Sequence, residues 1–561
     1  MTSSRRLAAF LLLAAIPLGF LAVFFFYPLF AILRLSLFPE GRLAAAAIRE
    51  VVETPYYARV LWFTTWQAGL STLGAFLAGL PVAYIFSHYR FPGKTLLRGL
   101  TTLPFVMPTV VVAAAFGALL GPRGLLNALA VAWLGLQQPP IRLANTIWII
   151  LLAHIFYNTA IVIRMVGGFW ANLDPRLTAA AAVLGADPWH RFRHITLALL
   201  TPSLAAAGVL VFLFNFTSFG VVLILGGARF ATLEVEIYRS AVRLFDLPTA
   251  AVLSLVQLGF TLAFLIVYTR LQARITGPLS LRPGRVHERA PRSWAERILV
   301  YGSLSSLGLL LAAPFLALIV RSLTLGGGFG LQHYRALFVN RTGSVFFITP
   351  VEAVRNSLLF AAAAVALSLV IGVASAYLLA GRSAGRRQAA ALLDPIFMLP
   401  LGASAVTLGF GFILALDEPP LNLRASLALI PLAHTLIAFP FVLRALLPTL
   451  RSLDPRLREA AAVMGAGPGR VLRYIDAPIL ARALIVGVVF AFTVSMGEFS
   501  ASLLVSRPQF LTLPVAIYRF LGQPGLANYG QALALSVILL LVTVLAFLGL
   551  ENLRYDDIGE F

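Results

Sequence analysis

Few side chains that could do chemistry lie inside the long apolar stretches of this 561-residue chain. Glu498 is an acid within such a stretch, where a carboxylate is costly unless it faces a partner or a wet cavity. Asn158, Asn215, Ser218 and Ser495 occupy neighbouring apolar stretches. These five residues are candidates for lining a path through the membrane. Structural hydrogen bonds between helices are the alternative, and these residue types fit both.

Two histidines, His154 and His434, occupy matching positions in two apolar stretches. A histidine without a carboxylate or a second histidine at ligand spacing is more often a hydrogen-bonded packing residue than a metal ligand. The chain contains no cysteine, which excludes disulfides and thiolate ligands. We therefore expect no metal site.

Phosphate-binding chemistry is also unexpected in this chain. Gly93-Lys94-Thr95 resembles the end of a phosphate-binding loop, but His88 stands where that loop requires its first glycine. No polar domain is present that could hold a catalytic triad or a carboxylate pair. We expect that the chain is not an enzyme and binds no cofactor of its own.

One short polar segment occurs twice. Residues 174–186 and 454–466 share ten of thirteen positions at a spacing of 280 residues. Asp174 and Asp454, each followed by proline, predict helix N-caps, and Gly185 and Gly465 predict helix ends. Both predicted helices have an alanine-rich face, which favours close docking of another protein over packing against the chain's own spans.

The second copy, residues 454–478, resembles the EAA loop of the membrane permeases of binding-protein-dependent ABC importers. In that family the loop is a coupling helix that sits in a groove of an ATP-binding subunit and transmits its motion to the spans. The coupling-loop residues of this copy are Asp454, Glu459, Ala460, Ala461, Gly465, Ile475 and Pro478.

The first copy, residues 174–198, departs further from the family pattern. Its coupling-loop residues are Asp174, Ala179, Ala180, Gly185 and Ile195. Ala179 stands where the pattern has glutamate, and Ala198 where it has proline. The resemblance therefore implies two docking helices, of which only the second carries the family's acid.

Further segments resemble a group of fused permeases for thiamine and ferric iron, in which one chain supplies both transmembrane halves. They are LLAHIFYN (151–158), TSFGVVLILGG (217–227) and SMGEFSASLLV (495–505). The resemblance implies two ATP-binding cassette subunits that bind ATP and Mg²⁺, and a periplasmic or lipid-anchored solute-binding protein. Ferric iron and thiamine are the expected solutes, ahead of polyamines, sulfate and phosphonates.

The composition requires a membrane protein, since 60% of residues are hydrophobic and 12% charged. A spanning helix needs about 20 mainly apolar residues. Twelve such stretches lie near 8–33, 58–87, 97–120, 144–168, 199–225, 248–271, 297–321, 356–380, 390–416, 426–450, 478–505 and 530–550. We expect an all-α protein with about twelve transmembrane helices in two parallel six-helix repeats, the fold of a type I ABC importer transmembrane domain.

The expected organisation is a first permease half at 1–271, a cytosolic linker at 272–296 and a second half at 297–561. With both termini in the cytosol, more than half of the 43 basic residues face inward. This favours a multi-pass protein of the bacterial cytoplasmic membrane. The net charge of +21 then reflects orientation and does not predict nucleic-acid binding.

A secondary transporter of the major facilitator type is the main rival, since it also has twelve spans in parallel halves. That class usually carries acids and arginines in the loop after its second span, whereas residues 88–98 contain no acid. A membrane scaffold or receptor explains neither the duplication nor Glu498.

Overall fold

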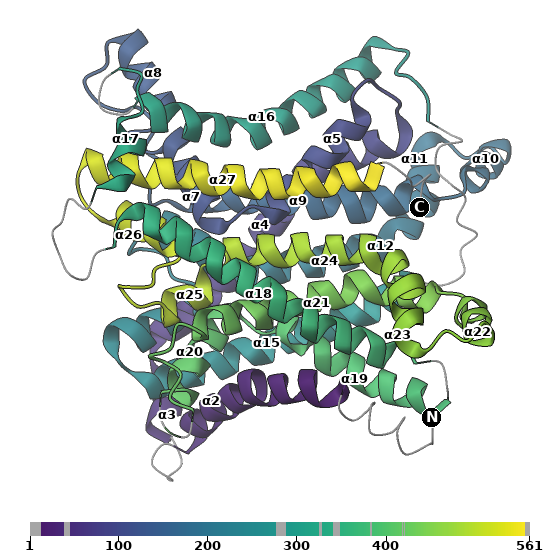
Figure 1. Cartoon of the computed structure of the whole chain (residues 1–561). Helices are drawn as coiled ribbons and strands as arrows, with labels where there is room; N and C mark the ends of the chain where they lie inside the picture. Colours follow the sequence, from purple (N-terminus) through teal and green to yellow (C-terminus); the bar gives the residue numbers. More distant parts are fainter. Residues whose placement is uncertain are drawn as a thin grey trace. The chain divides into compact units, whose positions relative to one another are not determined.

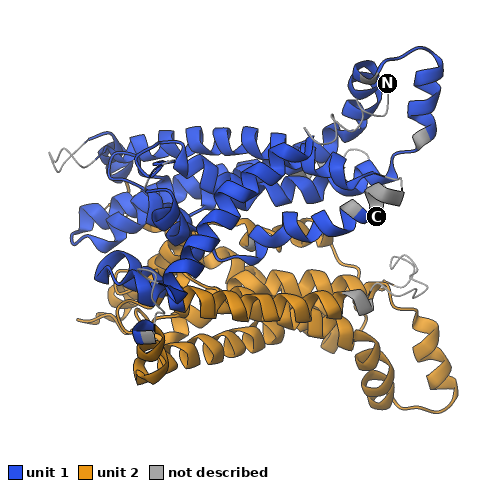
Figure 2. Cartoon of the chain, turned by 90° about the horizontal axis from the view of Figure 1, so that it is seen from below, with its two compact units in different colours: residues 1–47, 237–252, 331–561 blue, residues 48–236, 253–330 orange. Residues whose placement is uncertain are grey.

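The computed structural model describes residues 13–38, 45–275, 288–324, 328–339, 348–381, 384–417, 419 and 421–555. These residues are almost entirely helical and form two compact units (Figure 2). Unit 1 is drawn from residues 1–47, 237–252 and 331–561, and unit 2 from 48–236 and 253–330. Residues 276–287 of the predicted linker and the first residues of the predicted first span lie outside the described ranges.

Unit 2 contains most helices of the first half of the sequence. In order they are α3 (Ala45–Glu53), α4 (Pro55–His88), α5 (Lys94–Leu100), α6 (Leu103–Val106), α7 (Thr109–Leu120), α8 (Leu125–Leu134), α9 (Ile147–Ala171), α10 (Pro175–Val183), α11 (Pro188–Arg191), the π-helix η3 (Phe192–Thr196), α12 (Leu197–Phe216), α13 (Gly220–Leu225), α14 (Leu233–Tyr238), α15 (Leu247–Ile275) and α16 (Trp294–Thr324). Short parts of α3, α14 and α15 belong to unit 1.

Unit 1 contains the start of the chain and most of the second half. Its helices are η1 (Ala22–Phe26), α2 (Tyr27–Leu37), η4 (Arg239–Leu244), α17 (Gln332–Arg335), η6 (Ala336–Phe338), α18 (Pro350–Leu379), α19 (Ala384–Gly402), α20 (Ala405–Ala415), α21 (Leu429–Ser452), α22 (Pro455–Val463), α23 (Pro468–Val471), η7 (Leu472–Asp476), α24 (Ala477–Gly497), α25 (Ser500–Val505), α26 (Leu513–Gly522) and α27 (Leu526–Tyr555) (Figure 1).

Among the described residues, eleven helices are long and apolar enough to cross a membrane. A twelfth span is the pair Ala390–Gly402 and Ala405–Ala415, which is bent by 95°. The predicted set of about twelve spans is thus confirmed. Three predicted spans are wrong in extent. The long helices of 199–225 and 478–505 end at Phe216 and Gly497, and the span predicted at 97–120 begins only at Thr109 and continues to Leu134.

The first helix of each half of the sequence packs against helices of the other half. In unit 1, α2 packs against α20 of the second half. In unit 2, α16 packs against α7, and the Phe315 ring of α16 meets Phe156 of α9 edge-to-face at 5.5 Å. Each unit therefore consists mainly of helices from one half and also contains the first helix of the other half.

Within each unit, the second and fourth spans of one half form the tightest helix pair. A Cβ on Gly79 would lie 2.8 Å from Cβ of Val162, and a Cβ on Gly372 would lie 2.8 Å from Cβ of Val442. Only glycine permits this approach of α4 to α9 and of α18 to α21, because protein interiors leave no room for an added methyl group. The second and fourth spans thus pack together in the same way in both halves.

The described end of the linker attaches to the loop after α4, within unit 2. Arg90 N–H donates to Arg289 O at 2.9 Å, and Arg289 N–H donates to His88 O at 3.1 Å. Lys94 Nζ lies 2.8 Å from a Glu288 carboxylate oxygen. Burial lowers the pKa of Lys94, and the Glu288 carboxylate opposes that shift. The chain that follows the linker is therefore fixed to the first half before α16 begins.

Candidate functional site

Both duplicated segments form the short helices that their sequences predict. In α10 the Asp174 carboxylate accepts from Arg176 N–H at 2.9 Å, and in α22 Asp454 accepts from Arg456 N–H at 3.0 Å. Gly185 and Gly465 follow with φ of +85° and +79°. This left-handed conformation suits glycine, so each segment is a capped helix with a glycine stop.

Each of these helices exposes large apolar side chains at its C-terminal end. Leu184 is 87% exposed and Met464, at the same place in the second copy, is 83% exposed. Val183 and Val463 are similarly uncovered. Within unit 1, α22 lies beyond the ends of α21 and α24 (Figure 1). Exposed apolar tips on a protruding helix mark a surface that a partner covers.

The remaining coupling-loop residues occupy matching places in the two copies. Ala179 and Glu459 are exposed, as are Ala180 and Ala460, whereas Ala461 is buried. Ile195 and Ile475 lie in equivalent π-helical turns, η3 and η7, and the exposed Pro478 is the second residue of α24. Their contribution to coupling stays a prediction.

Asp187 forms a second cap in the first copy alone. Its carboxylate accepts from His190 N–H at 3.1 Å and also contacts the His190 ring. These hydrogen bonds lower the pKa of Asp187. Gly467 occupies the matching position in the second copy, so the two loops differ in charge beyond Glu459.

Glu498 lies at a break between helices and not inside one. It follows the last residue of α24, and its two carboxylate oxygens accept from Ala501 N–H and Ser502 N–H, each at 2.8 Å. Backbone N–H groups at a helix start stabilise a carboxylate. The buried charge of Glu498 is therefore satisfied by the first turn of α25.

The two predicted path asparagines form one buried network in unit 2. Asn158 Nδ2 donates to Asn215 Oδ1 at 2.8 Å, and the Gln67 amide donates to Asn215 O at 2.9 Å. Gln67 Oε1 is buried without a hydrogen-bond partner. The structure thus joins α4, α9 and α12 through polar groups, and the predicted role of these asparagines in a path stays a prediction.

The paired histidines are hydrogen-bonded to serines within their own halves. His154 contacts the hydroxyls of Ser71 at 3.1 Å and Ser218 at 2.8 Å. His434 contacts Ser495 at 2.7 Å and Ser502 at 2.8 Å. Ser218 and Ser495, both predicted to line the path, therefore serve as partners of the fourth-span histidines.

The sequence did not predict a repeated contact after the fifth span of each half. Leu233 N–H donates to Thr64 Oγ1 at 3.0 Å, and Leu513 N–H donates to Ser357 Oγ at 2.6 Å. The two hydroxyls are 293 residues apart. An internal alignment of the two second spans would have placed these hydroxyls at matching positions and so indicated the repeated contact.

The short helices α14 and α26 follow the fifth span of each half and are largely buried. Leu513, Val515 and Ile517 of α26 are buried, as are the residues of α14. Helix α26 packs against α27, α18 and α24 of unit 1.

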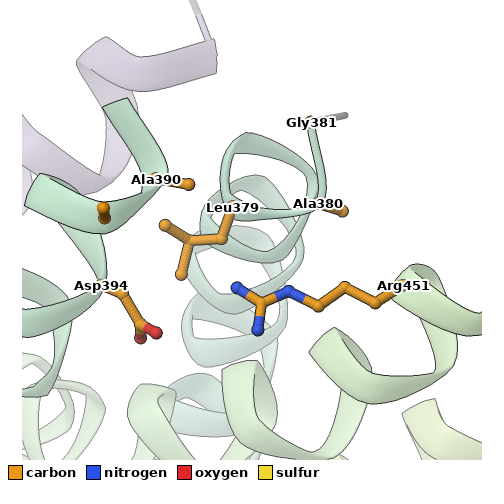
Figure 3. Close-up of a pocket in the computed structure, with 7 residues that line it drawn as sticks. Leu379, Ala380, Gly381, Ala390, Asp394 and Arg451 are labelled. Carbon is orange, nitrogen blue, oxygen red and sulfur yellow. The ribbon is translucent and has the colours of Figure 1, made fainter. Parts of the chain in front are cut away.

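Unit 1 also contains a cavity of about 310 Å³ beside the chain that leads to α22. Figure 3 shows the Arg451 guanidinium and the Asp394 carboxylate directed toward it from α21 and α19. Asp394 Oδ1 lies 3.3 Å from Arg444 Nη2. The cavity is lined by Leu379, Ala380, Gly381, Ala390, Ala391, Asp394 and Arg451.

Comparisons with known proteins agree with this geometry. Residues 71–277 match the family described as binding-protein-dependent transport system inner membrane component. The thiamine transport system permease protein of Escherichia coli (strain K12) is 29% identical over 517 residues, covering 90% of each chain. The thiamine permease of Brucella suis biovar 1 is 29% identical over 86% of this chain and 87% of its own length.

Two further similarities cover about half of the chain. A 2-aminoethylphosphonate permease of Salmonella typhimurium, described as putative in its name, is 29% identical over 48% of this chain and 93% of its own length. A solved bacterial ABC transporter involved in alginate import covers 49% of this chain with 19% identity and a TM-score of 0.41. Along most of its length the chain is therefore similar to thiamine transport permeases, and its residues 71–277 match an inner membrane component of binding-protein-dependent transport systems.

Proposed function

We propose that the chain forms the membrane path of an ATP-driven importer that receives a small solute from an external binding protein. Two ATP-binding cassette subunits would dock on α10 and α22 and hold ATP and Mg²⁺. Both termini and the linker would lie in the cytosol, in line with the distribution of arginines. The sequence halves 1–271 and 297–561 would each supply one side of the path.

The observation that carries this proposal is the pair of capped helices with exposed apolar tips. Burial of the Leu184 side chain by a partner would contribute about 1.5–3 kcal/mol of favourable free energy, and burial of Met464 would contribute a similar amount. A single exposed leucine needs no partner, but the same exposed pair of residues at the same place in both copies does. Two equivalent docking helices fit two copies of one partner subunit.

The proposed mechanism is alternating access driven from these helices. When the two ATP-binding subunits approach each other, α10 and α22 move with them. Each helix continues through a short π-helical turn into a span, from α10 to α12 and from α22 to α24. Movement of the docked helix would therefore be passed to the spans through thirteen residues on each side, which include α11 in the first half and α23 in the second.

Thiamine is the proposed solute, because the relatives that cover most of this chain are named for thiamine. Ferric iron, the other first choice from sequence, has weaker support. The candidate path residues Asn158, Asn215, Ser218, Ser495 and Glu498 are buried or half-buried in this state. They would contact the solute only after the spans rearrange.

The test is uptake by the reconstituted complex of this chain, its ATP-binding subunits and its binding protein. Labelled thiamine should accumulate inside proteoliposomes only with ATP, and thiamine-loaded binding protein should stimulate ATP hydrolysis. Uptake without ATP-binding subunits would overturn the proposal and favour a secondary transporter. Transport of ferric iron and not thiamine would overturn the choice of solute.

A further inference from the structure

One buried acid, Asp476, ties the second docking helix to two spans, and the described residues of the first half show no such tie. Asp476 is the last residue of η7 and immediately precedes α24. Its Oδ1 lies 2.8 Å from Nε of Arg458, which belongs to α22. The Tyr377 hydroxyl of α18 donates to Oδ2 at 3.4 Å. The two oxygens of one carboxylate thus contact two different helices.

Burial makes this contact stronger than an ordinary surface ion pair. The Asp476 side chain is only 7% exposed, whereas that of Arg458 is 41% exposed. A buried carboxylate that loses its cation is left as an uncompensated charge. Separating α22 from the start of α24 is therefore unfavourable, and the two elements are expected to move together.

The first half has hydroxyl residues at the same places. Thr178 corresponds to Arg458 and Thr196 to Asp476, both at the spacing of 280 residues. The Thr178 hydroxyl donates to Pro175 O in its own helix at 2.9 Å. Tyr84, which corresponds to Tyr377, instead packs against the rings of His88 and Trp170. Among the described contacts, α10 has no ionic link to α4 or α12.

We propose that Arg458 and Asp476 are positioning residues that make α22 a rigid extension of α24, so that the second half transmits the stroke of its ATP-binding subunit more efficiently than the first. This inference rests on the proposed function and adds to it an ion pair that links the docking helix to the spans in the second half. The difference is independent of the exposed acid at Glu459, because Asp476 is buried and faces the spans.

The chain supplies its own matched variants for the test. Arg458→Thr combined with Asp476→Thr gives the second half the first half's residues, and Thr178→Arg combined with Thr196→Asp does the reverse. Arg458→Lys keeps a cation and serves as the conservative control. Arg458→Thr alone leaves the buried Asp476 without its cation, and its folding is followed by the yield of full-length chain in lipid nanodiscs.

The first measurement is amide hydrogen exchange of the full chain in nanodiscs without partners. Arg458→Thr is expected to raise exchange in α22 by on the order of tenfold, with little change in α10, and Arg458→Lys to leave it near the wild-type rate. The reversed pair in the first half should slow exchange in α10. Unchanged exchange of α22 in Arg458→Thr would overturn the tie, whatever the transport result.

The second measurement is solute imported per ATP hydrolysed by the reconstituted complex. The Thr/Thr variant of the second half should import at least about threefold less thiamine per ATP while still hydrolysing ATP, whereas Arg458→Lys should keep the wild-type ratio. A purely structural role would lower uptake and hydrolysis together, and that result overturns the inference. If the wild-type complex imports nothing, the proposed function fails while the exchange result still decides the tie.

Discussion

Nε2 of His434 lies 3.5 Å from the Glu498 carboxylate, and at the same place in the first half Nε2 of His154 lies 2.8 Å from the hydroxyl of Ser218. The histidine on the fourth span contacts two serine hydroxyls in each half, and in the second half an acid lies beside it as well. The two halves have the same arrangement of helices but differ in the residue at this position, which is Glu498 in the second half and Ser218 in the first.

Replacing Glu498 tests whether this acid caps a helix or receives a cationic solute. Glu498→Ala removes both hydrogen bonds to the start of α25 and should cost about 1–3 kcal/mol of stability. Glu498→Gln keeps an acceptor and should retain more of that stability and most of the uptake. Thermal unfolding and uptake of both variants are the measurements. A Glu498→Gln variant that unfolds like wild type but imports nothing would instead assign the acid to the path.

Gly465→Asp should leave membrane insertion intact and abolish coupled uptake. The φ of +79° at this position costs a non-glycine residue roughly 1–2 kcal/mol and would distort the end of α22. The measurement is ATP-dependent uptake beside the amount of chain in the membrane. Gly185→Asp is the matched variant in the first half, and normal uptake in Gly465→Asp would contradict the coupling assignment of α22.

The two docking helices should respond differently to exchange of their distinguishing acid. Glu459→Ala should weaken coupling, whereas Ala179→Glu should leave it unchanged or strengthen it, because an exposed acid adds a contact with a basic partner groove. Both side chains are exposed, so neither change should affect folding. Stimulation of ATP hydrolysis by the loaded binding protein reports the effect, and equal responses would remove the asymmetry.

Gly372→Ala should destabilise the chain by about 1–3 kcal/mol, since its Cβ would lie 2.8 Å from Cβ of Val442. Val442→Ala in the same chain should recover part of the loss, because it removes Cγ1, which would also lie 2.8 Å from the added Cβ. The melting temperature in detergent is the measurement. Gly302→Ala is the matched control, because nothing lies within 4 Å of a Cβ there; equal melting temperatures for the two alanine variants would contradict the tight packing of α18 on α21.

The sequence predicted the helical spans and the capped helices because these depend on local chemistry. Apolar length predicts a span, and an aspartate before proline with a glycine eleven residues after the aspartate predicts the ends of α10 and α22. The breaks at Thr217–Phe219 and at Glu498 were not predicted. The residues around them are as apolar as a continuous span, and only the hydrogen bonds of Glu498 reveal the start of a second helix.

The exchange of leading helices and the tie at Asp476 could not be predicted for a different reason. A pattern along the chain indicates that α2 and α16 are apolar, but not which helices they pack against. Arg458 and Asp476 are 18 residues apart, which would separate them by about 27 Å on one continuous helix. Their contact exists because the chain reverses direction after the glycine stop at Gly465, between α22 and η7.

Helix α24 begins after one buried acid, Asp476, and ends at another, Glu498, whereas α12 has Thr196 and Ser218 at these places. Covalent fusion makes such divergence possible. Because every translated chain supplies one copy of each half, a mixed pair always assembles and neither half has to be self-complementary. A homodimeric permease would have to carry each of these acids twice or not at all, so gene fusion here fixes the ratio of the halves as well as their proximity.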